Sequence, residues 1–552
     1  MAASSPAPAS ASASSGPSAS SSLPASGSLG GLEVAMATSS SWPLLPNACL
    51  EHIFLNADPK AACALASTCR AWRDALNNNK ALWAQLYERE YGMEGEARRH
   101  FRADWRRLFA EQASLAHRWA AGTPLDRRRW AGHEGAVNAI SMLPGGEAVA
   151  TASADSTIRV WSRAHGTWST VIGNVGGGTV TSVASTRGYL VAGARDRNVR
   201  LWKLGRAVDS IDGHEPLATF APARTSARRG PINGVAMLGG DLSTGKERHS
   251  DIAFALNNKV NDVAGSGGSR GSSSSSISRW VSRDPTAPVE ELRRNQPRAP
   301  SQVAAVFATG EVSLWPTDGG RGGATEEQPI GQHEGAVYGI CTAGSPQHQH
   351  RHGGEESSVL ATCSADRTVR LWDVRVDGAG REGAVLVLEG HADGALCVAS
   401  GGGMRLASGG MEGSVVLWDL RVASNEANGS RHSRACLMRL DRPGCSDLEA
   451  WEADWVKGID ICGATGRVGV VYKSGALCVW PGWWKESSLN QQSVDELELM
   501  SGCPAQARPL FEEKGAGARC VTIDEDGVVA GGKVDVLAWD FAVANRIDNH
   551  IQ

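Results

Sequence analysis

The sequence predicts a mainly β protein with a helical N-terminal part. The stretch from Gly331 to Asp373 contains three short runs of strand-forming residues separated by turn formers, at Val337–Cys341, Val359–Cys363 and Thr368–Trp372. Similar stretches recur at 132–161 and 390–419. Between residues 45 and 119, by contrast, apolar residues recur at helical spacing. A unit of three short strands cannot bury its own faces, so we expect the repeats to pack against one another.

Composition limits the classes of function. The chain has 552 residues, too many for one ordinary core, and a formal net charge of −4. Because no large basic field is present, neither nucleic acid nor a membrane is expected as a partner. Its 12 Cys residues include no Cys-x-x-Cys pair, which favours reduced thiols in a cytoplasmic and/or nuclear protein. No apolar run approaches the roughly 18 residues of a membrane helix.

The N-terminal 122 residues divide by composition into three parts. Residues 1–40 are mostly Ser, Ala, Pro and Gly, and are expected to be disordered. Residues 41–83 carry helical stripes, with Leu50, Ile53 and Phe54 in the first of them. Residues 84–122 continue the helical spacing and predict either a stiff linker or a helical cap on the following domain.

The recurring unit resembles the WD repeat. Each clear copy has a His soon after a Gly at its start and an Asp six residues before a closing Trp, as Asp366 and Trp372 show. The resemblance implies a seven-bladed β-propeller over 123–541, with closing residues Trp161, Trp202, Trp315, Trp372, Trp418, Trp480 and Trp539. The long gap between the second and third leaves eight blades open, because 251–256 has the character of a strand. A disordered insert is expected at about 261–300 and a tail at 542–552.

Two features of the ring follow from this resemblance. Arg127–Ala131 is expected to pair with the last blade, since an open array would leave edge strands exposed. Buried networks are implied in two blades, formed by His133, Ser153, Asp155 and Trp161, and by His333, Ser364, Asp366 and Trp372. In the fifth repeat Glu412 replaces the Asp. Because the pattern repeats at structural spacing, it favours architecture over a catalytic triad, and no catalytic residue is predicted.

The helical block resembles an F-box, the module that docks the Skp adaptor of cullin-based ubiquitin ligases. Its Leu-Pro start, its Ile-Phe pair and a Cys-Arg-x-Trp-Arg run have the spacing of that family. The resemblance implies adaptor-binding residues Leu45, Pro46, Leu50, Ile53, Phe54, Leu65, Cys69 and Trp72. The chain is then expected to be a non-catalytic substrate-recognition subunit of a Skp-cullin-F-box ligase. The alternatives are an ordinary helical core and a WD-repeat scaffold for signalling or RNA–protein assembly.

Partners of WD-repeat propellers often bind over the central channel. The corresponding positions include Asn138, Arg195, Tyr338, Lys457, Lys473 and Arg519. The last three, with Lys533, form a basic quadrant that predicts an acidic or singly phosphorylated target; the alternative is a solvated rim with recognition elsewhere. No cofactor or metal is expected, because the His-Gln-His-Arg-His run at 348–352 lacks acidic or Cys partners at ligand spacing.

Overall fold

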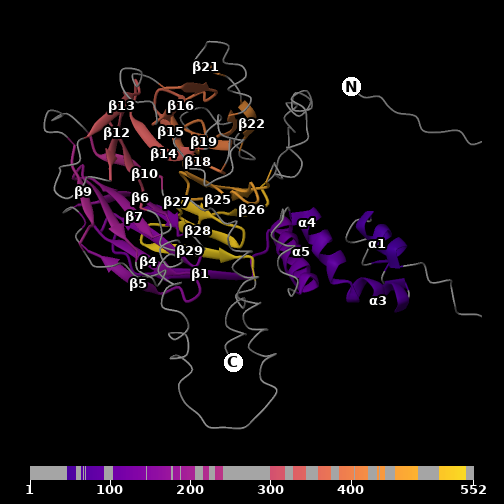
Figure 1. Cartoon of the computed structure of the whole chain (residues 1–552). Helices are drawn as coiled ribbons and strands as arrows, with labels where there is room; N and C mark the ends of the chain where they lie inside the picture. The colour runs from indigo at the N-terminus through magenta and orange to yellow at the C-terminus, as the bar shows by residue number, and fades with distance from the viewer. Residues whose placement is uncertain are drawn as a thin grey trace, which may run out of the picture. The chain divides into compact units, whose positions relative to one another are not determined.

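The structure is a computed structural model, drawn in Figure 1. It describes residues 47–56, 64–65, 67–68, 70–91, 104–143, 146–173, 175, 178–186, 188–204, 215–222, 230–239, 299–317, 327–343, 359–374, 384–402, 405–420, 432–433, 436–441, 454–482 and 509–542. Two compact units, Met1–Leu82 and Trp83–Gln552, make up the chain. The expected tail at 1–40, the strand at 251–256, nearly all of the insert at 261–300 and the tail beyond 542 lie outside the described residues.

Two short helices of the first unit share an apolar contact. Helix α1 spans Asn47–Asn56 and α3 spans Arg70–Asn78. Phe54 of α1 is fully buried, and its ring meets Trp72 of α3 edge-on at 5.9 Å with an interplanar angle of 81°. Trp72 and Leu76 lie four residues apart and so share one face of α3, while Arg73 and Asp74 are exposed.

Helix α4 spans Lys80–Tyr91 and α5 spans Trp105–Ala121, and aromatic residues join them. Trp83 packs on Phe109 at 5.4 Å, and Tyr87 packs on Trp105 at 5.6 Å. The Asp104 side chain caps α5 by accepting from the backbone N–H of Arg107, and Gly122 ends the helix in the left-handed conformation.

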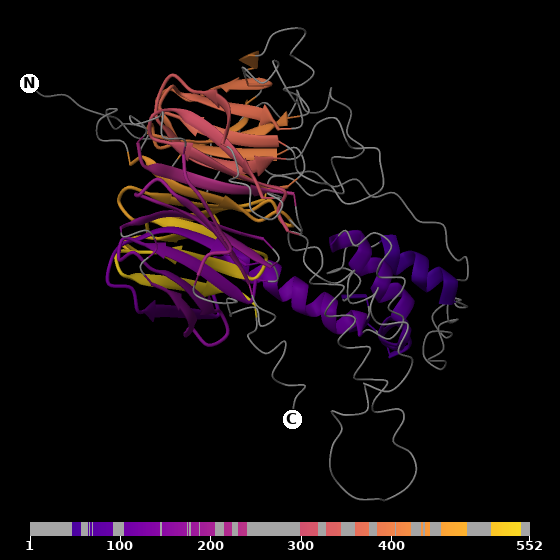
Figure 2. The same cartoon turned by 60° about the vertical axis from the view of Figure 1, so that its left-hand side comes forward.

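The rest of the second unit is a ring of seven antiparallel sheets, which confirms the predicted seven-bladed propeller (Figures 1 and 2). Blade one contains β2 (Val137–Met142), β3 (Ala148–Ser153), β4 (Ile158–Ser162) and β5 (Trp168–Ile172). Blade two contains β6 (Val180–Thr186), β7 (Tyr189–Ala194), β8 (Val199–Lys203) and β9 (Ala218–Phe220). Blade three contains β10 (Ile232–Leu238), β11 (Gln302–Phe307), β12 (Glu311–Pro316) and β13 (Gln328–Gln332).

The later blades differ more from one another. Blade four contains β14 (Val337–Ala343), β15 (Val359–Ser364), β16 (Thr368–Asp373) and β17 (Leu386–Glu389), with β21 (His432–Ser433) added in parallel at its edge. Blade five contains β18 (Ala395–Ser400), β19 (Arg405–Gly410), β20 (Val415–Asp419) and β22 (Cys436–Leu440). Blade six contains β23 (Val456–Ile461), β24 (Val468–Tyr472), β25 (Leu477–Trp480) and β26 (Phe511–Glu513). Blade seven contains β27 (Cys520–Ile523), β28 (Gly527–Gly531), β29 (Asp535–Asp540) and β1 (Asp126–Ala131).

All seven predicted closing Trp residues lie on the third strand of a blade and are 0–4 % exposed. Large apolar side chains at this position fill the space between neighbouring blades. Trp372, for example, lies in one apolar cluster with Val312 and Leu314 of blade three. The ring therefore has a core divided among the junctions between blades.

The N-terminal strand β1 closes the ring, as predicted for Arg127–Ala131. It pairs antiparallel with β29, from Asp126 opposite Asp540 to Ala131 opposite Asp535. Trp130 is buried and stacks on Trp161 of blade one, with ring centroids 5.9 Å apart. Arg163 of blade one forms ion pairs with Asp524 and Asp540 of blade seven, at 2.5 and 2.8 Å. The ladder completes blade seven with a strand from the start of the ring, and the aromatic contact and the buried charges join this blade to blade one.

The C-terminal end of α5 packs on blades six and seven. Trp119 donates to the carbonyl of Glu525 at 2.9 Å, and the Arg467 guanidinium lies over its ring at 4.6 Å. Leu115 and Trp119 belong to an apolar cluster that includes Val479 and Phe541. Gly122 has no room for a side chain, because a Cβ would lie 2.4 Å from the Leu510 carbonyl oxygen. This contact is the one expected of a helical cap on the ring.

Candidate functional site

Blades one and four each contain a buried chain of hydrogen bonds from Trp to Asp. In blade one the Trp161 indole donates to the Thr151 hydroxyl at 2.8 Å, and this hydroxyl lies 2.8 Å from Nε2 of His133. His133 Nδ1 lies 2.7 Å from Asp155. Blade four repeats the chain with Trp372, Thr362, His333 and Asp366, at 2.8 Å for each contact.

The prediction of Ser153 and Ser364 as the central hydroxyls is corrected by these contacts. Thr151 and Thr362 occupy that place, each two residues earlier on the same strand and on the same face. Ser153 instead donates to the Gly135 carbonyl at 3.0 Å and accepts from the Asp155 backbone N–H. Ser364 likewise accepts from the backbone N–H of Asp366. Both Ser residues therefore hold the turn, while the Thr residues link Trp to His.

Blade five completes the same network with a longer acid. His391 lies 2.6 Å from Glu412 through Nδ1 and 2.6 Å from the Ser408 hydroxyl through Nε2. The Trp418 indole donates to Ser408 at 2.8 Å. A Glu side chain reaches the His because Gly410 leaves room: a Cβ there would lie 1.9 Å from a Glu412 carboxylate oxygen.

The protonation states make these networks directional. Burial lowers the pKa of His133 and of His333 in spite of their carboxylate partners, so both are neutral near pH 7. Burial raises the pKa of Asp155, but hydrogen bonds from Thr157 and His133 outweigh it and lower the value to about 2. Since an ionised carboxylate only accepts, His Nδ1 donates to Asp, and Nε2 accepts from the Thr hydroxyl. The His and Asp residues are held by structural bonds rather than placed for catalysis.

In blades one to six, a repeated backbone bond brings the turn after the second strand to the start of the inner strand. In blade six the Lys473 N–H donates to the Trp455 carbonyl at 2.9 Å, and equivalent bonds join Arg195 to Thr179 and Ala365 to Ala336. The face of the ring formed by these turns and inner-strand starts is called the turn face below. The substrate-binding positions predicted from the sequence lie on it.

Three of those positions form a basic cluster, defined as Lys457, Lys473 and Arg519. Lys457 and Lys473 are exposed, and Arg519 is half-buried. The pKa of Lys457 is lowered, mainly by partial burial and secondly by the positive charges of Arg519 and Lys473. The three cations are therefore close enough to repel one another. The Lys473 ammonium also lies 4.6 Å from the centre of the Trp455 ring. Such a cluster can bind an anionic group at the junction of blades six and seven.

The other predicted binding positions behave differently. The Asn138 amide donates to the Val180 carbonyl of the next blade at 2.9 Å, as Asn233 does to Val337 at 2.7 Å. Asn138 is thus engaged in joining blades. Tyr338 is 37 % exposed in blade four, and Arg195 is exposed in blade two. Their role in binding stays a prediction.

The predicted adaptor-binding residues are described in part. Leu45, Pro46 and Cys69 lie outside the described residues, and only the backbone of Leu50 is described. Ile53, Leu65 and Trp72 are partly exposed, whereas Phe54 is fully buried against Trp72. Adaptor contact by these residues stays a prediction, with Phe54 acting in the packing of α1 on α3.

Thiol chemistry has little support in the ring. Burial raises the pKa of Cys341 and of Cys397 to about 12, so both stay protonated near neutral pH and are poor nucleophiles.

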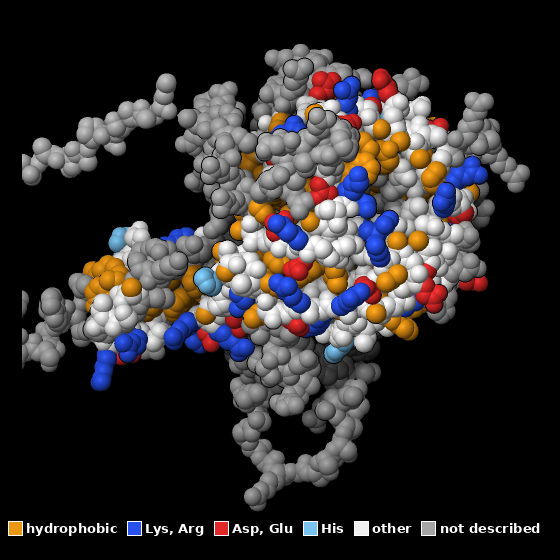
Figure 3. All heavy atoms as spheres, turned by 180° about the vertical axis from the view of Figure 1, so that it is seen from behind, with side chains coloured by type: hydrophobic (Ala, Val, Ile, Leu, Met, Phe, Trp, Pro, Cys, Tyr) orange, Lys and Arg blue, Asp and Glu red, His pale blue; other side chains and the backbone are white. Residues whose placement is uncertain are grey.

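Within the described parts of the chain, no group of His, Cys, Asp and Glu has the geometry to hold a metal ion. None of the described helices has the length and apolar character to cross a membrane. Figure 3 shows basic and acidic side chains interspersed over one side of the molecule.

Two family models match the sequence. The F-box-like model matches residues 42–89. The model of the WD domain, G-beta repeat, matches residues 126–162, 169–203, 326–373 and 383–419. These ranges end with the third strands of blades one, two, four and five. These are the blades that keep Asp or Glu in the turn, while Thr309, Ser474 and Lys533 stand there in the other three.

Two solved structures are similar to about three quarters of the chain. "Structure of U3-55K" has a TM-score of 0.47 and 17 % identity, covering 75 % of this chain and 98 % of that one. "Crystal structure of RRP9 WD40 repeats" has a TM-score of 0.47 and 17 % identity, covering 76 % and 98 %. Identities this low transfer no function. From the family matches and the seven closed sheets, the chain is an F-box-like and WD-repeat protein.

Proposed function

We propose that this protein is the substrate-recognition subunit of a Skp-cullin-F-box ubiquitin ligase. The observation that carries the proposal is the presence, in one chain, of an F-box-like segment at 42–89 and a closed propeller. The F-box-like segment would bind the Skp adaptor and, through it, a cullin. The propeller would hold the target protein, and the conjugating enzyme would be a separate protein. Its place of action would be the cytoplasm, the nucleus or both.

The basic cluster supports an acidic or singly phosphorylated target. Lys457, Lys473 and Arg519 share one field on the turn face, where the Arg guanidinium can form two parallel hydrogen bonds to a phosphate or carboxylate. Burial of the anion would be modest, because two of the three cations are exposed. The affinity of the site is therefore expected to fall as salt is raised.

The adaptor half of the proposal is tested by co-purification. Skp adaptor and cullin are expected with the wild-type chain and are expected to be lost when Leu45 and Pro46 are both changed to Ala. A control is Asp74→Ala, an exposed substitution on α3 outside the Cys-Arg-x-Trp-Arg run. Recovery of other partners without adaptor or cullin from wild-type protein would contradict the proposal and favour a scaffold.

The target half is tested by proximity labelling with and without proteasome inhibition. Proteins labelled only under inhibition are the expected targets, and their labelling is expected to drop for Lys457→Glu combined with Arg519→Glu. Arg106→Glu combined with Lys203→Glu, two exposed positions outside the predicted binding set, is the matched double charge reversal. Unchanged target capture by the double variant would rule out the basic cluster as the binding site.

A further inference from the structure

A groove runs along the side of the ring between blades six and seven, with a volume of about 520 Å³. Its walls come from β1 on blade seven and from the segment that follows β26 on blade six. The volume lies within the roughly 300–1,000 Å³ of typical ligand pockets. The groove is distinct from the basic cluster, none of whose three residues lines it.

Strand alternation determines which side chains face this groove. In the β1–β29 ladder, Arg127 is opposite Trp539 and Arg129 is opposite Leu537, so these four share one face of blade seven. The intervening residues Arg128 and Trp130 face blade one, where Arg128 donates to the Arg163 carbonyl at 2.8 Å. The groove face of β1 therefore presents two Arg side chains, two residues apart, over an apolar floor.

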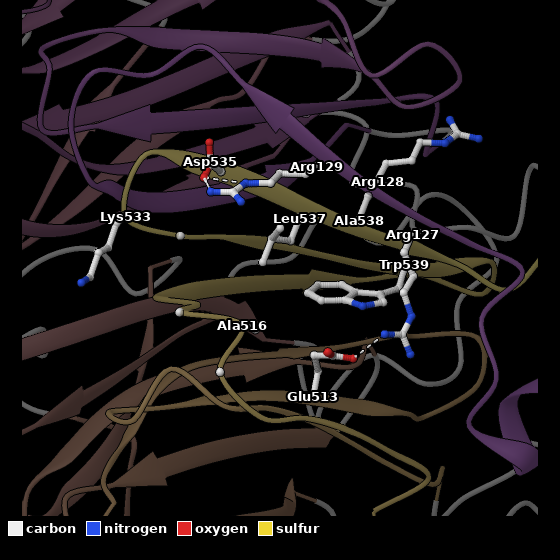
Figure 4. A pocket seen from close by; sticks show the side chains of 13 residues that line it. Arg127, Arg128, Arg129, Glu513, Ala516, Lys533, Asp535, Leu537, Ala538 and Trp539 are labelled. Atoms are coloured by element: carbon white, nitrogen blue, oxygen red, sulfur yellow. Dashed lines mark hydrogen bonds and ion pairs between the residues drawn. The ribbon is translucent and has the colours of Figure 1, made fainter.

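Each of these two Arg side chains is paired yet keeps free donors. Arg127 lies 3.1 Å from Glu513, with 58 % of its side chain exposed. Arg129 donates through Nε to Asp535 at 2.8 Å, with 71 % of its side chain exposed. A guanidinium has five N–H donors, so each Arg can bind a second carboxylate while keeping its partner. Figure 4 shows Leu537 and Trp539 between the two ion pairs.

The remaining walls leave open space and favour an anionic occupant. Gly515, Ala516 and Gly517 form part of the blade-six wall, and a Cβ at either Gly would meet nothing within 4 Å. Lys533 adds a third cation at the far end, so that Arg127, Arg129 and Lys533 face only two carboxylates, those of Glu513 and Asp535. A chain in extended conformation is thin enough to lie between such small residues, and its alternate side chains point the same way.

We propose that this groove binds an extended acidic segment of a partner protein, with carboxylates at two positions that are two residues apart. Residues two apart in an extended chain are separated by roughly 6.6 Å, which is the spacing of Arg127 and Arg129 along β1. The two carboxylates point to the same side of the segment and contact the Arg side chains, and the side chain between them points away from the floor. This surface goes beyond the proposed function, because it requires neither the adaptor nor the turn face.

The test is binding of a fluorescein-labelled decapeptide with Glu-Leu-Glu at its centre to the full chain, followed by fluorescence anisotropy. The Gln-Leu-Gln peptide is the matched probe and is expected to bind at least about tenfold more weakly. Arg127→Gln with Arg129→Gln is expected to lower the affinity for the acidic peptide roughly tenfold to thirtyfold. Arg106→Gln with Arg107→Gln, on the exposed face of α5, removes the same charge and is expected to have no effect.

A second variant keeps every charge. Ala516→Leu narrows the groove and is expected to weaken binding about tenfold while the melting temperature stays unchanged. Equal binding of both peptides, or full binding by both groove variants, would overturn the proposal. So would binding that appears only when Glu496 and Glu498 are changed to Gln, since the occupant would then be the Glu-Leu-Glu run of this chain itself.

Discussion

The indole of Trp119 stacks on the ring of Phe541, with centroids 3.7 Å apart and planes 11° from parallel. The Arg467 guanidinium lies over the same indole at 4.6 Å, so that the Trp is in contact with an aromatic ring and a cation at once. A residue of α5 thereby joins blades six and seven, and α5 is part of the propeller's folded unit.

Trp119→Ala is expected to lower the free energy of unfolding by roughly 3–5 kcal/mol, because a large buried side chain is removed and a cavity is left. Trp119→Phe keeps the ring but loses the bond to Glu525, and should cost about 1 kcal/mol. Urea denaturation measures both. Ser114→Ala, exposed on the same helix, is the control and should leave stability within about 0.5 kcal/mol. A small effect of Trp119→Ala would mean that α5 is dispensable for the ring.

Ring closure makes a second prediction. Trp130→Ala removes a side chain that is 3 % exposed and stacked on Trp161, and is expected to cost roughly 3–5 kcal/mol. Trp168→Ala is the same substitution at a position 49 % exposed in blade one, and should cost about 1 kcal/mol. Thermal unfolding of the two variants side by side distinguishes them, and equal losses would contradict the closing role of β1.

The corrected network predicts a difference between two neighbouring hydroxyls. Thr362→Val keeps the shape but leaves Trp372 Nε1 and His333 Nε2 without their partner, and is expected to cost roughly 2–4 kcal/mol. Thr362→Ser keeps the hydroxyl and should cost less than about 1.5 kcal/mol. Ser364→Ala loses one backbone contact, about 1 kcal/mol. A larger loss for Ser364→Ala than for Thr362→Val would restore the original assignment.

A partly buried acid gives a prediction about pH. Burial raises the pKa of Asp460 to about 6, even though the carboxylate accepts from Thr522, Ile523 and Ile461. The folded state therefore keeps this proton to a higher pH than the unfolded chain, whose Asp ionises near 4. The contribution of Asp460 to stability falls as pH rises from about 4 through 6, by roughly 3 kcal/mol in total.

Asp460→Asn cannot ionise, and so serves as the reference for this effect. Denaturation of wild type and variant at pH 4.5 and pH 7.5 is expected to show wild type losing stability relative to the variant at the higher pH. Because other carboxylates titrate equally in both proteins, the difference isolates Asp460. Parallel pH profiles would show that this carboxyl titrates alike in the folded and unfolded states.

Much of the ring could be predicted because its large residues repeat. The seven closing Trp residues and the pairing of β1 were implied by the resemblance to the WD repeat, and the need to protect edge strands supports the pairing. The outer strands could not be placed as well: β9 and β26 have three residues each, and β21 reaches blade four from the connection within blade five. Such strands carry too few residues to show a period.

The site was less predictable for a related reason. Residues i and i+2 of a strand share a face, so alternation alone could not choose between Thr151 and Ser153. The role of Asn138 depends on a carbonyl of the next blade, 42 residues later in the chain. The side groove combines β1 with the segment after β26, and no local pattern connects residues so far apart in sequence.

The pairing of β1 with β29 also has a consequence for synthesis on the ribosome. Domains emerge N-terminal part first, at roughly 5–20 residues per second. The strand at Asp126–Ala131 therefore cannot pair until its partner strand, Asp535–Asp540, has been synthesised. Until then both ends of the nascent ring present open edges that invite pairing with other chains. An mRNA truncated before codon 535 would yield a chain that lacks β29 and cannot close the ring, even if its earlier blades fold.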